Sequence, residues 1–516
     1  MKEQAANRYI KLIRILAGAL VPFVVCGIYC LIRGFSPLDF FVPNSINNDS
    51  VYYYKMVDGV LAGGIPRGYM GYNESHALIG TFGAWSPIII THWVLWGFVF
   101  GWGYSSAIWC NLVLISLAFA LFVALTDMDL LHLALVTVAL AAFPSFSIHV
   151  MSLLPETAVL VALMIYMGCA INYCKGNEKK IHIGIMYFLG FWLTLIRPFM
   201  ALLALLPTYF VFKRKGKKVI WLFFVLPIVE LALYFAFAHF LTAEYFLPMF
   251  SFEFAEKMLH GKFVEGLWIL IYQVRGNLNS ICGYVKDAFS FGMTMGTQYF
   301  ISALTALILL ILAFFKREKE KRPIYLTIGI TAWAVIGSII MFTKWADDGG
   351  RHTWAFAVCG ILLLLGFRHN IFGKVTCGVT GLALIVFIIV GSMVPTDYDV
   401  PVVNAEKASS VEYWGELARS GAIEMSDDIG YDNTIIWAFI DYYDDRQIVM
   451  DFSGLYAVPA ESGISCCFPD YIIANFDNLK SRYIMADSRG KIAALCAEKG
   501  LKVVGEHENV IMYQRY

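Results

Sequence analysis

Apolar runs recur along this chain from residue 10 to residue 394, and most of them are 15 to 23 residues long. A helix of about 20 apolar residues covers the roughly 30 Å hydrocarbon core of a bilayer. Such runs must be helical, because the bilayer offers no water to unpaired backbone groups. Charged residues make up only 15% of the sequence, whereas soluble domains contain about a quarter. The sequence therefore predicts a polytopic α-helical membrane protein of the cell membrane.

Basic residues mark one side of the membrane. They lie in the N-terminal segment and in residues 175–180, 213–218, 316–322 and 368–374. The positive-inside rule places these segments in the cytoplasm. We therefore expect a cytoplasmic N-terminus, and the segments between the clusters then fall on the outer side: residues 33–86, 197–198, 242–290, 343–352 and everything after 395.

The number of spans depends on one stretch. Four apolar runs (87–101, 105–125, 130–148 and 154–173) lie between Trp85 outside and Lys175 inside. Four crossings give the wrong parity, so we expect residues 87–101 to be partly interfacial or re-entrant. About 11 transmembrane helices follow from this, and a missed span elsewhere gives 13.

Two domains are expected. Residues 1–394 form the transmembrane domain, with a first outer loop over 33–86 and an outer amphipathic segment over 242–290, in which 246–259 is expected to lie on the membrane surface as a helix. From residue 395 the composition changes, and residues 401–516 hold 18 acidic and 10 basic side chains. Short apolar runs there predict a small extracytoplasmic α/β domain. Its expected elements are strands near 434–440, 471–474 and 482–486, a helix over 491–499 and a hairpin over 501–504 and 510–514.

The first outer loop contains a candidate catalytic acid. Asp49 follows Asn47 and Asn48 and precedes three tyrosines, of which Tyr53 and Tyr54 are candidate acceptor-binding residues. A carboxylate at a membrane boundary can act as a general base on an acceptor hydroxyl. Asp49 can equally cap a short helix that begins at Val51.

Further charged residues are expected on the outer side. Glu156 follows Pro155 at the start of an apolar run, Arg197 precedes a proline between two runs, and the 344–352 segment contains Lys344, Arg351 and His352. Intramembrane and boundary charges mark functional sites by default. The alternatives are an ordinary helix start for Glu156, a snorkelling side chain for Arg197 and internal ion pairs for the 344–352 loop.

The net charge and the cysteine spacing give no indication of nucleic-acid binding or of a metal site. The formal net charge is zero, so nothing indicates a nucleic-acid partner. The eleven cysteines include no Cys-x-x-Cys and no Cys/His pair at zinc spacing, and no metal-ligating residues are predicted.

The layout resembles the GT-C superfamily of integral-membrane glycosyltransferases, in the branch of the bacterial protein-mannosyltransferase-like and aminoarabinose-transferase-like enzymes. The resemblance rests on Asn48-Asp49 with its tyrosines, on Pro155-Glu156, on the Leu-x-Arg-Pro motif at 195–198 and on Arg351 in a late outer loop. It covers roughly residues 10–394. The chain departs from the family in having His352 after Arg351 and Glu156 as the second acid.

The resemblance implies that Asp49 is the general base, that Arg197 and Arg351 lie near the donor phosphate, and that Glu156 is a second acid in the cavity. Lys344 and His352, in the same loop as Arg351, are further candidates for binding the donor phosphate. The remaining candidate cavity and acceptor residues are Tyr53, Tyr54, Glu74 and His76. A divalent metal is the one cofactor that the resemblance allows.

The sequence thus predicts an inverting glycosyltransferase. It would move a sugar from a polyprenyl-phosphate donor to a cell-envelope glycopolymer, lipid or protein on the outer face. Two alternatives stay open: a flippase or transporter of lipid-linked saccharides, and a polysaccharide polymerase or ligase of another membrane fold.

Overall fold

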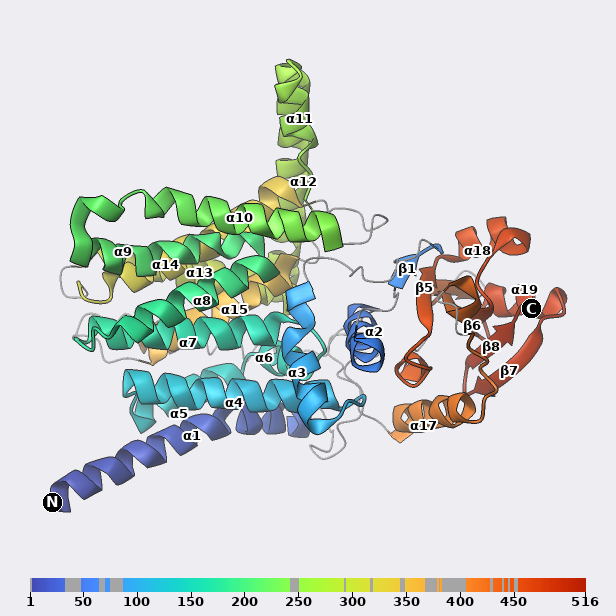
Figure 1. Ribbon diagram of the computed structural model, residues 1–516, viewed down its shortest axis with the longest axis horizontal. Coiled ribbons are helices and arrows are strands. Elements are labelled where there is room, and N and C mark those ends of the chain that lie inside the picture. The colour runs from blue at the N-terminus through green and yellow to red at the C-terminus, as the bar shows by residue number, and fades with distance from the viewer. Residues whose placement is uncertain are drawn as a thin grey trace.

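The computed structural model shows a helical bundle beside a smaller α/β part (Figure 1). It describes residues 2–32, 48–64, 70–74, 87–241, 250–291, 294–315, 319–343, 349–366, 378–379, 381–382, 405–426, 430–438, 440–443, 446–449 and 453–516. The statements below concern these residues.

Six described helices are long and apolar enough to cross a membrane, so the chain is a multi-pass membrane protein. They are α1 (Lys2–Ile32), α4 (Ser106–Thr126), α7 (Glu156–Cys174), α10 (Leu222–Leu241), α13 (Thr294–Phe314) and α14 (Arg322–Phe342). Shorter helices complete the bundle: η1 (Pro87–Ile90), α3 (Thr91–Phe100), α8 (Lys180–Ile196), η2 (Pro198–Ala204), α9 (Leu205–Lys215), η3 (Gly216–Val219) and α15 (Gly349–Leu365).

One predicted span is broken. The run over 130–148 forms α5 (Leu130–Ala141) and α6 (Pro144–Val150), which meet at 83°. Pro144 explains the break, because proline removes a helical hydrogen bond and clashes with the preceding turn. With α3 too short to span alone, the described residues contain six long spans, or seven if the bent pair counts as one. The predicted number of about 11 is therefore not confirmed.

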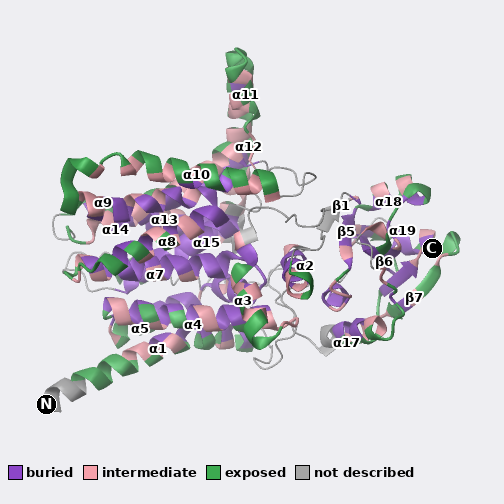
Figure 2. Cartoon of the chain, viewed as in Figure 1, coloured by how far each residue is buried: buried purple, intermediate pink, exposed green. Residues whose placement is uncertain are grey.

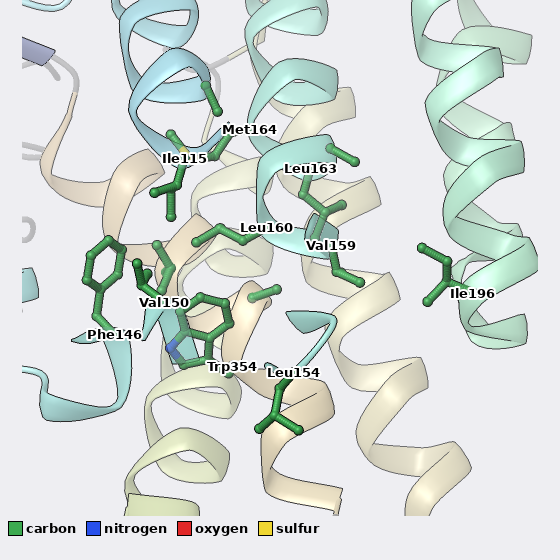
Figure 3. Packing of buried hydrophobic residues seen from close by; sticks show 14 of the residues in the cluster. Ile115, Phe146, Val150, Leu154, Val159, Leu160, Leu163, Met164, Ile196 and Trp354 are labelled. Atoms are coloured by element: carbon green, nitrogen blue, oxygen red, sulfur yellow. The ribbon is translucent and has the colours of Figure 1, made fainter. Parts of the chain in front are cut away.

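The bundle core is apolar and tightly packed. Figure 2 shows the buried residues concentrated on the inner helices, while α10 presents an exposed outer side. Ile115 of α4, Leu160 of α7 and Trp354 of α15 are fully buried within one cluster (Figure 3). Helices α13 and α15 approach closely at Gly360, where an added Cβ would lie 2.2 Å from Thr305 Oγ1. Such packing fixes the helix ends that bear the charged residues.

The segment between α10 and α13 forms a helical pair. Helix α11 (Glu253–Leu259) packs on α12 (Phe263–Phe291), and the pair projects from the bundle (Figure 1). The amphipathic helix expected over 246–259 thus begins at Glu253 within the described residues, and residues 242–249 lie outside them. Helix α12, with 29 residues, was not predicted.

The C-terminal part contains a mixed sheet in the order β1-β5-β2-β6-β8-β7. Its strands are β2 (Thr434–Ala438), β5 (Gly463–Cys467), β6 (Tyr483–Asp487), β7 (Lys502–His507) and β8 (Val510–Gln514), with a separate hairpin of β3 (Ile440–Tyr443) and β4 (Arg446–Val449). The helices are α17 (Ala405–Arg419), α18 (Pro469–Asn475) and α19 (Lys491–Glu498), with short turns η5 (Tyr431–Asn433), η6 (Ser453–Tyr456) and η7 (Phe476–Asn478).

Most C-terminal elements agree with the prediction, and one does not. Residues 471–474, predicted as a strand, lie inside helix α18. Pro469 at its first position and Asp470 in its first turn are typical of a helix start. The edge strand β1 (Met70–Tyr72) comes from the segment between α1 and η1 and pairs in parallel with β5. The sheet therefore joins the two parts of the chain.

Candidate functional site

Four separate segments place charged side chains at one end of the bundle. Asp49 lies in the first turn of α2 (Asn48–Gly63), and Glu156 begins α7. Arg197 lies between α8 and η2, where the following proline forces its backbone into an extended conformation. Arg351 and His352 lie in the first turn of α15. Every one of these residues stands at a helix end.

Asp49 and Arg351 form the first acid–arginine pair. Arg351 Nη1 donates to Asp49 Oδ2 at 2.5 Å. The Asp49 side chain is 25% exposed and that of Arg351 is 10% exposed. The pair thus lies at the edge of the buried region, where Asp49 retains access to the outside.

Glu156 and Arg197 form the second pair, which is deeper. Arg197 Nη2 donates to Glu156 Oε1 at 2.8 Å, and the two side chains are 2% and 3% exposed. His352 Nδ1 lies 3.6 Å from the same carboxylate oxygen. Because an unpaired charge this deep would be very costly, the pairing accounts for how both groups can be buried.

Two buried polar residues that the sequence did not single out border this cluster. His149 of α6 lies close enough to Glu156 and Arg351 to interact with both electrostatically. Its Nε2 lies 3.1 Å from Gln298 Nε2 of α13, and its ring packs on Trp354 at 4.6 Å between centroids. The break at Pro144 turns α6 toward the cluster, and that turn is the signal that could have pointed to His149.

Several buried polar atoms in the cluster have no hydrogen-bond partner among the described residues: Glu156 Oε2, His149 Nδ1 and Gln298 Oε1. Buried polar atoms in proteins are almost always satisfied by protein or by bound molecules. Each of these three atoms can therefore form a further hydrogen bond.

The tyrosines of α2 divide between two environments. Tyr53 is buried and interacts electrostatically with Asp49, Arg197 and Arg351, and burial raises the pKa of its phenol well above the usual value. Tyr53 therefore lies beside the cluster as an uncharged phenol. Tyr54 instead stacks on Trp102 at 5.3 Å and meets Tyr456 edge-on at 5.1 Å. It lies between the bundle and the C-terminal part.

Glu74 lies apart from the cluster. Its carboxylate accepts from the backbone N–H groups of Lys480 and Ser481 at 2.9 Å and 2.7 Å, and from Ser481 Oγ at 2.7 Å. These contacts tie the end of β1 to the C-terminal sheet part and account for the buried carboxylate. Of the remaining predicted residues, His76 and Lys344 lie outside the described residues.

Lys55 forms a second tie between α2 and the C-terminal part. Its buried ammonium donates to the carbonyls of Val458 at 2.6 Å and Pro459 at 3.0 Å, and lies 3.2 Å from Asp58. Burial lowers the pKa of Lys55, while Asp58 acts in the opposite direction. Helix α2, which contains Asp49, thus contacts the C-terminal part through Lys55 and through the packing of Tyr54 on Tyr456.

No metal site is evident in the part of the chain that the structure describes. No three His, Cys, Asp or Glu side chains gather there at metal-binding distance. The two carboxylates of the cluster each face an arginine, and this arrangement suits an anionic group better than a cation.

The comparisons with known proteins concern the three-dimensional arrangement. No family model and no curated protein matches the sequence. Among solved structures, the chain is similar to the archaeal oligosaccharyltransferase AglB from Archaeoglobus fulgidus in complex with an inhibitory peptide and a dolichol-phosphate, with 12% identity, a TM-score of 0.48 and coverage of 96% of this chain and 73% of that one.

It is also similar to ArnT from Cupriavidus metallidurans bound to undecaprenyl phosphate, with 11% identity, a TM-score of 0.46 and coverage of 96% of this chain and 97% of that one. AglB and ArnT are GT-C enzymes, the superfamily that the sequence resembles. The functional case below rests on the side chains of the charged cluster.

Proposed function

We propose that this protein is a glycosyltransferase that moves a sugar from a polyprenyl-phosphate donor to a cell-envelope acceptor, with Asp49 as general base. The observation on which the proposal rests is the meeting of Asp49, Glu156, Arg197 and Arg351, from four segments, in two acid–arginine pairs. Two arginines at one membrane boundary suit the phosphate of a lipid-linked sugar, because guanidinium groups bind phosphate oxygens bidentately.

The difference in depth assigns the two acids different roles. Asp49 is 25% exposed at the edge of the cluster, whereas Glu156 is 3% exposed beneath it. An acceptor hydroxyl approaching from outside reaches Asp49 first. Glu156 would instead hold Arg197 in place, and its free Oε2 would accept from a sugar hydroxyl.

The transfer step exchanges one bond for another at the anomeric carbon. The acceptor oxygen bonds to that carbon as the bond from carbon to phosphate oxygen breaks. The acceptor proton passes to the Asp49 carboxylate, and the lipid phosphate departs with the bonding electrons. Positive groups fixed beside the departing phosphate stabilise its growing charge, and attack opposite the leaving group inverts the anomeric centre.

The pair between Asp49 and Arg351 gives the donor a second role. The donor phosphate and Asp49 would compete for the guanidinium group of Arg351. Donor binding would thus loosen this contact and leave the Asp49 carboxylate facing the acceptor hydroxyl.

The proposed orientation places the N-terminus in the cytoplasm and the C-terminal part outside. Lys175 directly follows α7, and Lys213, Arg214 and Lys215 end α9. Glu156 begins α7, so the basic residues lie at the opposite membrane face from the charged cluster.

The test is sugar transfer by the purified protein from a panel of defined polyprenyl-phosphate sugars. We expect transfer with wild type and a loss of about 10²- to 10⁴-fold in Asp49→Asn, the usual range for a lost general base. Asp477→Asn, which changes an exposed acid far from the cluster, is the matched control and should keep full activity. Saturable lipid binding with no transfer from any donor would favour a transporter instead.

A further inference from the structure

A polar cavity lies at the end of the bundle opposite the charged cluster. It has a volume of about 290 Å³ and lies between the beginning of α1 and the end of α4. Its lining residues are Asn7, Ile10, Lys11, Arg14, Val123 and Asp127. None of them belongs to the charged cluster described above.

The packing of α1 on α4 explains why the cavity exists. At Gly18 the helices touch so closely that an added Cβ would lie 2.8 Å from Val123 Cγ2. Toward its N-terminus α1 continues, whereas α4 ends at Thr126 and Asp127 adopts a left-handed conformation. In Figure 1 the N-terminal part of α1 leads away from the bundle. The cavity forms where the two helices part.

Cations outnumber anions around this cavity. Lys11 Nζ lies 3.1 Å from Asp127 Oδ1, and Lys175 Nζ lies 3.9 Å from Asp127 Oδ2. Arg14 also lines the cavity, and its buried Nε has no hydrogen-bond partner among the described residues. Two ammonium groups therefore share the Asp127 carboxylate, and the guanidinium group of Arg14 lines the same cavity.

Lys175 lies among other cations. Burial lowers the pKa of Lys175, Asp127 raises it, and the neighbouring Lys321 and Lys11 lower it further. Its ammonium donates to the carbonyl of Thr126. A further anion in the cavity would relieve the repulsion among these ammonium groups.

The position of the cavity at a membrane boundary indicates which kind of anion it would bind. Helix α7 has 19 residues from Glu156 to Cys174, which corresponds to about 28 Å, close to the thickness of the hydrocarbon core. Lys175 follows it, so the cavity lies at the membrane face opposite Glu156. Ile10, which is 45% exposed, lines the cavity and gives it an apolar rim. An occupant with a phosphate head and a hydrocarbon tail matches this boundary.

We propose that this cavity binds the phosphate of an anionic membrane phospholipid, held by Lys11 and Arg14, with Lys175 beside Asp127 as a further cation. Basic pockets between transmembrane helices at the cytoplasmic face suit such headgroups. Bound there, the lipid joins the beginning of α1 to the ends of α4 and α7 at the point where they separate.

The experiment measures thermal unfolding of the purified full-length protein in detergent while phosphatidylglycerol, phosphatidylcholine or inorganic phosphate is titrated in. Phosphatidylglycerol should stabilise wild type saturably. The double variant Lys11→Gln/Arg14→Gln should need roughly tenfold more phosphatidylglycerol for half of that effect. The control, Lys217→Gln/Lys218→Gln, removes the same charge from exposed positions of η3 and should behave as wild type.

A variant of opposite sign separates binding from misfolding. Asp127→Asn removes the competing carboxylate, so it should bind phosphatidylglycerol several-fold more tightly than wild type. Equal effects of phosphatidylcholine and phosphatidylglycerol, or equal losses in the control and the double variant, would overturn the site. Saturation by inorganic phosphate alone would overturn the lipid as its ligand.

Discussion

Arg351 Nη1 lies 2.5 Å from Asp49 Oδ2, although 302 positions separate the two residues in the chain. The contact joins α2 to α15 and holds the proposed base beside a cation. Under the proposed function, the donor phosphate and Asp49 would compete for this guanidinium group, and that competition would distinguish a catalytic pair from a structural one.

Asp49→Asn should therefore separate binding from turnover. The amide no longer holds Arg351 by charge, so the variant should bind a polyprenyl-phosphate lipid as tightly as wild type or a few-fold more tightly while losing transfer. Lipid binding is measured by titration of the purified protein. Binding that weakens in parallel with transfer would show that Asp49 stabilises the site as a whole and would remove its assignment as the base.

Glu156→Gln should cost stability. It removes the carboxylate that Arg197, which is 2% exposed, contacts at 2.8 Å, and removing one partner of a buried ion pair costs about 3–5 kcal/mol. Denaturant unfolding in detergent measures the change. Glu178→Gln breaks the exposed pair with Arg214 and should cost no more than about 1 kcal/mol. Equal effects of the two variants would show that the Glu156–Arg197 pair contributes little.

Glu74→Gln should loosen β1. Its carboxylate accepts from two backbone N–H groups and one hydroxyl of residues 480–481. An amide that mispairs with these donors costs about 1–3 kcal/mol. Hydrogen exchange should accelerate in residues 70–72 and in β5, which pairs with them. The control, Glu498→Gln, changes an exposed residue at the end of α19 and should leave hydrogen exchange in both strands unchanged. Unchanged exchange in Glu74→Gln would show that its contacts do not stabilise β1.

Lys55 makes the stability of the same junction depend on pH. Burial lowers its pKa below the ordinary value of 10.5. Between the lowered and the ordinary pKa the unfolded chain binds more protons, so stability rises with pH in that window. Wild type should thus gain stability relative to Lys55→Met as the pH rises toward 10.5. A constant difference between the two proteins across that window would contradict the lowered pKa.

The C-terminal part shows which strands and helices the local sequence pattern predicts and which it does not. The strands near 434–438 and 483–487, the helix over 491–498 and the final hairpin follow from alternating and helical apolar periods. The strand predicted at residues 471–474 was wrong, because a short apolar run fits a strand or a helix equally well. Strand β1 has only three residues and becomes a strand by pairing with β5, about 390 positions away.

In the charged cluster, the sequence identifies most of the residues but not their pairing. Asp49, Glu156, Arg197 and Arg351 stand out in the sequence because each is a charge beside an apolar run. Nothing in the sequence pairs Asp49 with Arg351 or Glu156 with Arg197. His149 and Gln298 were missed, because one polar residue in an apolar run has no local signature of its surroundings.

The sequence by itself determined that this chain is a multi-pass membrane protein and that its charges gather at helix ends, since hydrophobic length and charge are properties of contiguous residues. Only the tertiary structure decided which acid meets which arginine, where Pro144 turns α6, and that Glu74 serves the C-terminal sheet rather than the charged cluster. Those outcomes depend on contacts between distant segments, whose geometry is fixed by packing of the whole bundle.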